Sequence, residues 1–226
     1  MNFIKRKLKA AVYTGNESSG IIYENGDSVV FEITEDFAAQ LARVASEKHY
    51  TEINVLLPDN IFRFDIFGNK TITLPNAGYG AAIEESFAKH GLCAARIAPC
   101  ICYAAEAVLN KHTLNNCAIF LNEQAFYTFA LFDSKGEFLY VLSGTENAGR
   151  LSKVERMLRA YSESVENIKM EKLFILDGTG KSQVLLKETV ERFNSAPQLF
   201  ETETAVQKAG ISQVPISLLC AYGEIK

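Results

Sequence analysis

The sequence is poor in the residues that build common metal and hydrolase sites. It has only three histidines, His49, His90 and His112, and each follows a lysine. All three fall near the expected end of a helix, where a cation meets the negative end of the helix dipole. Neither H-E-x-x-H nor G-x-S-x-G occurs, so the zinc and serine hydrolases lack their usual signatures, although a divergent triad stays open.

Membrane, secretory and nucleic-acid features are also missing. No apolar run approaches the roughly 18 residues that a membrane span needs, and the basic segment 1–8 has no apolar core or cleavage site. The five cysteines are odd in number, and Cys100-x-Cys102 has no second pair for zinc. We expect all five to pack near the core as small apolar residues. A reducing, cytoplasmic compartment is therefore expected. The net charge of −4 argues against binding nucleic acid.

The order of the expected elements occurs twice along the chain. Each half predicts three strands, a helix and a strand, and the turn between its second and third strands carries a glycine, Gly26 or Gly136. The first half adds two short strands at 62–66 and 71–74, a helix at 80–90, a strand at 96–97 and a helix from Pro99 to 109. The second half adds a helix at 184–193, a strand near 199 and a helix near 216–222. In the first half the three strands, the helix and the last strand are expected at 8–13, 20–23, 28–33, 34–48 and 53–57. In the second half the corresponding elements are expected at 117–121, 125–132, 137–142, 150–164 and 173–176.

This repeat predicts an α/β fold of two similar lobes, each a mixed sheet with helices beside it. Two such lobes facing each other make the architecture of the actin, Hsp70 and sugar-kinase group, an actin-like (ribonuclease H-like) fold of duplicated βββαβα lobes. We expect the first lobe at 1–114, with a small inserted subdomain at about 59–98, and the second lobe at 115–226.

A glycine loop follows one of the predicted buried strands. Gly178-Thr179-Gly180-Lys181 lies between strand 173–176 and a helix, where backbone N–H groups can approach an anion. A true P-loop would need a glycine at position 175, which is isoleucine. The loop is therefore interpreted as an adenine-side or vestigial glycine turn, with a plain strand-to-helix turn as the alternative.

An active actin-like ATPase also needs an acidic residue and a glycine at the turn of each hairpin, for Mg²⁺ and phosphate. The first turn keeps Gly15 beside Thr14 but has Tyr13 in place of the acid, and the second has Glu123 without a glycine. Tight ATP–Mg²⁺ binding is therefore not expected, nor is another cofactor, a metal site or a catalytic residue. The vestigial nucleotide-binding residues are predicted to be Thr14, Gly15, Glu123, Gly178, Thr179, Gly180 and Lys181.

Several stretches resemble the pilus-assembly protein PilM and the cytoplasmic domain of the type II secretion L component. They are INVLLPDNIFRFDIFGNKTITLP, HGLCAARIAPCICYAAEAVL, CAIFLNEQAFYTFALFDSKGEFLYVLS and KLFILDGTGKSQVLLKETVERF. The resemblance covers most of the chain, from about residue 8 to residue 193. It rests on a strand ending in proline, an inserted subdomain, a G-L-x-x-x-x-I strand and an alanine-rich helix.

The resemblance implies a cytoplasmic scaffold at the inner face of the inner membrane. Its partner would be an inner-membrane platform protein or another secretion or pilus component, with membrane association through that partner and a homodimer left open. Phe62, Phe64 and Ile66 would lie near the family's partner-binding groove, and they share one face of their strand. Packing of that strand on its own domain is the alternative.

Two other functions stay open at this stage. An active actin-like ATP-binding enzyme, either a small-molecule kinase or an ATPase, would lose turnover when Glu123 is neutralised. A protein-binding domain of the same fold in an unrelated assembly would differ only in which proteins co-purify with it.

Overall fold

The structure is a computed structural model of the chain. It describes residues 9–14, 18–32, 39–40, 42–43, 52–65, 71–73, 77–145, 149–164, 170–193, 197–199 and 214–225.

The first five-stranded sheet is mixed, with strand order β3-β2-β1-β4-β7. β1 pairs with β2 in antiparallel fashion and with β4 in parallel, and β4 pairs with β7 in parallel. The β2–β3 hairpin turns at Gly26, whose φ of 89° suits glycine. The strands are β1 (Lys9–Thr14), β2 (Ser18–Tyr23), β3 (Ser28–Glu32), β4 (Glu52–Leu57) and β7 (Cys93–Pro99).

The second five-stranded sheet repeats this order as β10-β9-β8-β11-β12. Its central strand β8 again has an antiparallel hairpin partner, β9, and a parallel partner, β11. The strands are β8 (Cys117–Asn122), β9 (Tyr127–Phe132), β10 (Phe138–Gly144), β11 (Lys172–Asp177) and β12 (Pro197–Leu199). The matching topology confirms the predicted fold of two similar α/β lobes with mixed sheets.

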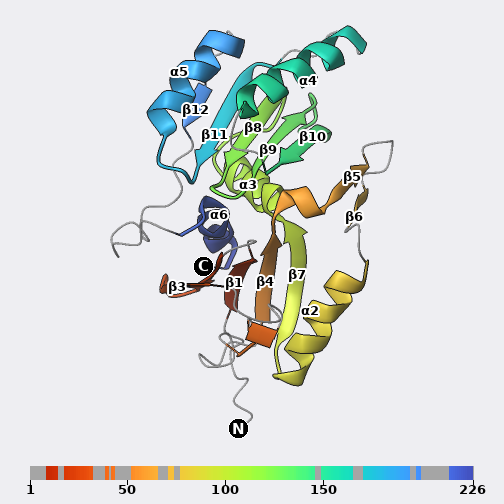
Figure 1. The fold of residues 1–226 in the computed structure, drawn as a ribbon, viewed down its shortest axis with the longest axis vertical. Coiled ribbons are helices and arrows are strands. Elements are labelled where there is room, and N and C mark those ends of the chain that lie inside the picture. Colours follow the sequence, from red (N-terminus) through yellow and green to blue (C-terminus); the bar gives the residue numbers. More distant parts are fainter. Residues whose placement is uncertain are drawn as a thin grey trace.

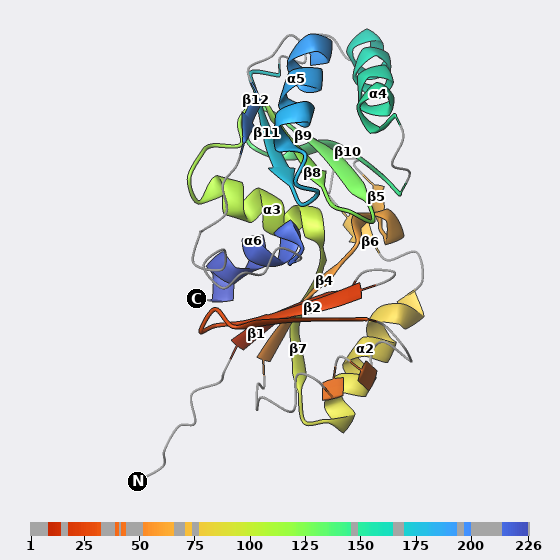
Figure 2. The same ribbon diagram turned by 60° about the vertical axis from the view of Figure 1, so that its left-hand side comes forward.

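The helices cover the two sheets and separate them. We call the first sheet with α2 the first lobe, and the second sheet with α4 and α5 the second lobe. α3 and α6 lie between the two sheets (Figures 1 and 2), where they pack on each other, and α6 also packs on β1 and β2. The helices are α2 (Ala77–Lys89), α3 (Cys100–Leu109), α4 (Arg150–Ser164), α5 (Ser182–Phe193) and α6 (Ile216–Ile225).

A short excursion leaves the first lobe after β4. The single-turn 3-10 helix η1 (Asp59–Ile61) leads into the two-stranded ribbon of β5 (Arg63–Asp65) and β6 (Thr71–Thr73). This ribbon stands to one side of both sheets (Figure 1), and η1 packs against β9 and β10 of the second lobe. The excursion therefore brings residues of the first lobe into contact with the second.

The largest buried cluster joins the two lobes. It contains side chains from β1, β4, α3, β8 and α6, including Tyr13, Leu56, Cys100 and Leu218. Two smaller clusters lie on the outer faces of the sheets, one beneath α2 and one beneath α4 and α5. Because each sheet is covered on both faces, β8 and β9 are buried along their whole length.

Most predicted elements are confirmed within one to three residues. Helix 150–164 agrees at both ends, whereas Pro99 caps α3 from outside instead of beginning it. Most of the predicted helix 34–48 lies outside the described residues. We expected all five cysteines to pack near the core, but Cys93 is exposed. The lobe boundaries at 114 and 115, and the subdomain at 59–98, stay predictions.

Candidate functional site

The turn between β8 and β9 holds an acidic side chain that points into the protein. Glu123 is only 3% exposed. Its Oε1 accepts hydrogen bonds from the backbone N of Ser217 at 2.8 Å and from the Ser217 Oγ at 2.5 Å. Ser217 lies in the first turn of α6, where the helix dipole favours a negative charge. Burial raises the pKa of Glu123, while the bonds from Ser217 oppose that rise.

Gly178 is needed to make room for this carboxyl group. A Cβ atom at position 178 would lie 2.5 Å from Glu123 Oε2. The backbone N of Gly178 also donates to the Asn122 carbonyl at 2.8 Å. The first glycine of the loop therefore packs against a buried carboxyl group, which differs from the phosphate role that its motif suggested.

The residues after Gly178 in the glycine loop form hydrogen bonds with the Asp177 carboxylate. Its Oδ1 accepts hydrogen bonds from the Thr179 N at 3.0 Å, the Thr179 Oγ1 at 2.6 Å and the Asn122 Nδ2 at 2.9 Å. Its Oδ2 accepts from the Ser182 Oγ at 2.9 Å, at the start of α5. Burial alone would raise the pKa of Asp177, but these bonds outweigh it and lower the pKa. An ionised aspartate thus occupies the loop that an anion would have to enter.

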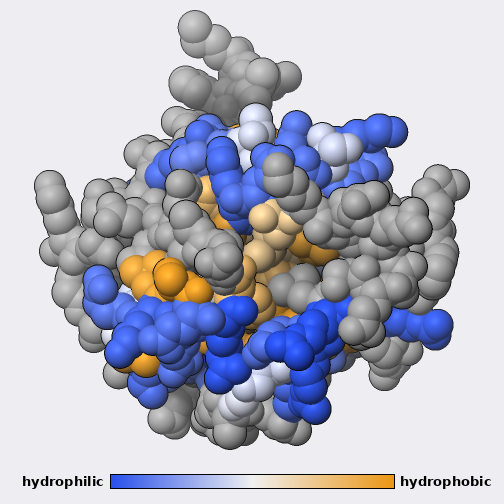
Figure 3. All heavy atoms as spheres, turned by 90° about the horizontal axis from the view of Figure 1, so that it is seen from above, coloured by the Kyte–Doolittle hydropathy of each residue, from blue (hydrophilic) through white to orange (hydrophobic). Residues whose placement is uncertain are grey.

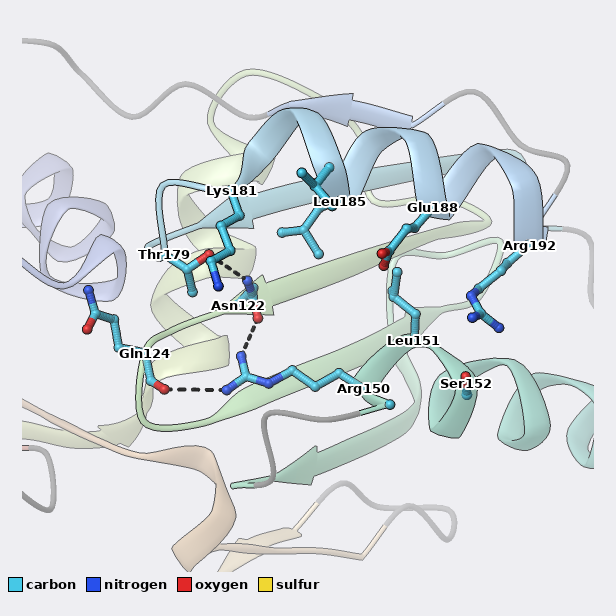
Figure 4. A pocket seen from close by; sticks show the side chains of 12 residues that line it. Asn122, Gln124, Arg150, Leu151, Ser152, Thr179, Lys181, Leu185, Glu188 and Arg192 are labelled. Carbon is cyan, nitrogen blue, oxygen red and sulfur yellow. Dashed lines mark hydrogen bonds between the residues drawn. The ribbon is translucent and has the colours of Figure 1, made fainter.

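Arg150, the first residue of α4, packs its side chain against the turn between β8 and β9, which we call the second hairpin turn. Its guanidinium group donates to the Asn122 Oδ1, to the Glu123 carbonyl at 2.9 Å and to the Gln124 carbonyl at 3.4 Å. It also lies over the Tyr127 ring, 5.4 Å from the centroid. Figure 4 shows the side chain reaching across to the turn. The turn is therefore held by an internal cation.

A pocket of about 660 Å³ opens beside this arginine, between α4 and α5. Apolar and charged side chains share its walls, and Figure 3 shows apolar atoms at the centre of this face between hydrophilic ones. Gly180, between the lining residues Thr179 and Lys181, has a φ of 73°, and no atom lies within 4 Å of where its Cβ would be. The lining includes Arg150, Leu151, Thr179, Lys181, Leu185, Glu188 and Arg192.

The turn between β1 and β2, in the first lobe, has no carboxylate at the position that Glu123 occupies in the second lobe. Thr14 is buried at the end of β1. Burial raises the pKa of Tyr79, and the Thr14 hydroxyl group opposes that rise. Tyr13, in the place of the expected acid, points into the core between the lobes. Burial raises the pKa of Tyr13, and Cys100 and Glu123 add to that rise. Gly15 lies outside the described residues.

Asp59 is a buried acid that the sequence analysis missed. It is fully buried, and its Oδ1 accepts a hydrogen bond of 3.0 Å from the backbone N of Ile101, in the first turn of α3. Burial raises its pKa to about 7, and the charge of Glu123 contributes. Its only signal in the sequence is an acid directly after a buried strand and a proline.

The predicted partner-binding residues are only partly described. Phe62 and Phe64 are both half-buried, with ring centroids 6.3 Å apart. Phe62 packs on the cluster of the first lobe and Phe64 on the cluster between the lobes. Ile66 lies outside the described residues. A role in binding a partner stays a prediction, and packing on the domain itself accounts for part of each ring.

The residues of the second turn do not fit a phosphate-bound Mg²⁺ ion. Glu123, its only carboxylate, is bonded to Ser217, and the cation nearest to the turn is Arg150. Across the described part of the chain, no group of three or more His, Cys, Asp or Glu side chains could hold a metal ion. Within the same residues, no helix is long and apolar enough to cross a membrane.

Comparison with known proteins identifies the fold. No protein-family model and no curated protein matches the sequence. Among solved structures, the PilM–PilN type IV pilus biogenesis complex matches with a TM-score of 0.68 and 10% identity, over 96% of this chain and 98% of that one.

Two further structures agree with this likeness. A Bacteroides thetaiotaomicron protein with an actin-like ATPase fold and unknown function has a TM-score of 0.58 and 13% identity, over 92% and 98% of the two chains. The ethanolamine utilization protein EutJ from Carboxydothermus hydrogenoformans has a TM-score of 0.55 and 10% identity, over 94% and 89%. The chain therefore has the actin-like ATPase fold.

Proposed function

We propose that this protein is a cytoplasmic scaffold of the actin-like fold, which acts by binding a partner protein without turning over a nucleotide. The observation that carries the proposal is the second hairpin turn. Its acid, Glu123, accepts hydrogen bonds from buried Ser217, and Arg150 donates a hydrogen bond to the backbone of the turn. A Mg²⁺–triphosphate would need that carboxylate and would have to displace that guanidinium group.

The partner we propose belongs to an inner-membrane platform of a type IV pilus or type II secretion system. Two likenesses support this choice, namely the sequence stretches given above and the fold shared with PilM in its complex with PilN. The protein would then be attached to the inner face of the inner membrane through its partner. A homodimer is compatible with the same role.

The contact surface we propose includes Phe62 and Phe64, where the chain enters the β5–β6 ribbon, together with Ile66. The two described rings leave part of their area open to solvent, and they stand where η1 reaches from the first lobe to the second. Half-buried aromatic rings are typical anchors in protein interfaces, because they bury a large area at little cost in conformational entropy.

Affinity capture after cross-linking in intact cells tests this function. We expect the wild-type chain to enrich a secretion or pilus platform protein, and Phe62→Ser to reduce that enrichment at least tenfold. Leu109→Ser is the matched control, because Leu109 is 56% exposed at the end of α3 and its change should leave capture intact. Thermal unfolding of each variant shows whether it is folded. Capture of no envelope-assembly protein by the wild-type chain would contradict the proposal.

The pocket between α4 and α5 favours a second candidate, an ATP-binding enzyme such as a small-molecule kinase or ATPase. Its volume of about 660 Å³ falls in the range of small-molecule sites. Lys181 and Arg192 could face an anionic ligand there. This function requires ATP turnover that falls when Glu123 is changed to glutamine, which a phosphate-release assay measures directly.

A further inference from the structure

β10 forms one edge of the second sheet. It pairs with β9 on one side, and in the part of the chain that the structure describes no strand pairs with it on the other. Figures 1 and 2 show it at the margin of the sheet, opposite β12. Every second residue of such a strand directs its backbone N–H and C=O groups away from the sheet, where they can pair with another strand.

β10 also lacks the features that usually keep an edge strand from pairing. Its sequence reads FLYVLSG, with neither a charged residue nor a proline. The other three edges of the two five-stranded sheets have such a feature. β3 ends at Glu32, β7 contains Arg96 and ends at Pro99, and β12 has only three residues and begins at Pro197. β10 is therefore the edge best suited to accept a further strand.

Both faces of β10 carry apolar side chains that are only half-buried. Tyr140 and Leu142 pack on the cluster beneath α4 and α5. Val141 packs from the opposite face on the cluster between the lobes. All seven residues of the strand keep part of their area exposed. A strand added at this edge would bury apolar area on both faces of the sheet.

A second copy of β10 is complementary to this edge. An antiparallel pair with its twofold axis at Val141 places Tyr140 of each copy opposite Leu142 of the other, and the two Val141 side chains opposite each other. Aromatic and β-branched pairs are favourable across antiparallel strands, and a strand without charge meets no like charge in its own copy. The register shift between Phe138 and Tyr140 lies outside this central segment.

We propose that the protein forms a homodimer in which two β10 strands pair in antiparallel fashion and join the second sheets of the two copies into one continuous sheet. The dimer goes beyond the scaffold function and does not depend on it. Because the contact is centred on a single strand, the dimer is weak and reversible, with a dissociation constant on the order of 10 µM.

Sedimentation velocity measures the dimer directly. We expect the wild-type chain to shift from monomer to dimer between about 1 µM and about 200 µM. Val141→Lys and Val141→Glu each bring two like charges together at the axis, and each should weaken the dimer at least about tenfold. Val190→Lys, at a position that is 50% exposed on α5, is the matched control and should leave the dimer intact. A wild-type monomer at every concentration would overturn the proposal in favour of a strand from another protein.

Mixing Val141→Lys with Val141→Glu tests the register of the pair. Opposite charges then meet at the axis, so an equimolar mixture should form a dimer at concentrations where neither variant does so alone. Val29→Lys, at a position that is 39% exposed on the edge strand β3, should leave the wild-type dimer intact. A mixture of the two folded variants that stays monomeric would contradict pairing at Val141.

Hydrogen exchange of the wild-type chain provides an independent test if the variants at position 141 do not fold. We expect the backbone amides of 138–144 to exchange more slowly as the protein concentration rises, because the second strand protects them. The amides of the edge strands β3 and β7 should exchange at the same rate at every concentration. Exchange in 138–144 that does not depend on concentration, or new protection at β3 or β7 instead, would also overturn the proposal.

Discussion

Replacing Glu123 with alanine is expected to lower the free energy of unfolding by about 3 kcal/mol. The change removes the only acceptor shown for the Ser217 backbone N, which is buried at the start of α6, and leaves a small void beside Gly178. Urea unfolding followed by circular dichroism measures the effect. A scaffold role predicts this loss in the absence of any nucleotide, because the side chain serves the fold itself.

Two further variants separate the contributions at this position. Glu123→Gln keeps an acceptor for Ser217 and should cost about 1 kcal/mol, and Ser217→Ala, which removes only the hydroxyl donor, should cost a similar amount. Glu84→Ala on the exposed face of α2 is the control and should stay within about 0.5 kcal/mol of the wild type. A loss below 1 kcal/mol in Glu123→Ala would show that the carboxyl group is not needed for the fold.

The second large effect is expected at Gly178. Changing it to alanine places a Cβ atom 2.5 Å from Glu123 Oε2, and that oxygen cannot move away freely because the same carboxyl group is bonded to Ser217. We expect a loss of about 2–3 kcal/mol in unfolding free energy. In the same loop, Gly180→Ala meets no atom within 4 Å but must adopt a φ of 73°, and it should cost about 1 kcal/mol.

A double-mutant cycle identifies the cause of the Gly178 effect. If the clash with Glu123 accounts for it, Gly178→Ala should cost at least 1 kcal/mol less in the Glu123→Ala background than in the wild type. The same cycle with Gly180→Ala should be additive, because position 180 does not touch Glu123. Additive behaviour at Gly178 would mean that the glycine serves another purpose, such as approach to a ligand.

The sequence predicted the fold well, because the signals for its elements are local. Asn25-Gly26 and the turn ending at Gly136 mark two hairpins with positive φ angles, and the apolar spacing of 150–164 gives both ends of α4. Duplication of these local patterns was enough to predict two lobes of the same topology. α2 ends at Lys89, two residues before Gly91 with its φ of 69°, and a glycine just past a helix is a local signal of the same kind.

The candidate site could be predicted only in part, because its interactions join residues far apart in the chain. The hydrogen bond between Glu123 and Ser217 spans 94 residues, and that between Asp59 and Ile101 spans 42. Arg150 was recognised only as the first residue of a helix, since nothing local indicates that it reaches the turn at Asn122. The glycine loop was found from its motif, but only the structure shows that Gly178 packs against a carboxyl group.

Calorimetric titration of the purified chain with ATP and Mg²⁺ tests the central claim most directly. Because Glu123 is hydrogen-bonded to Ser217 and Arg150 is hydrogen-bonded to the backbone of the turn, we predict no heat of binding even at high protein concentration. A nucleotide-binding actin-like protein titrated in the same buffer serves as the positive control. Micromolar binding that disappears when Mg²⁺ is removed would contradict the account, because the second turn would then open to receive a phosphate-bound metal ion.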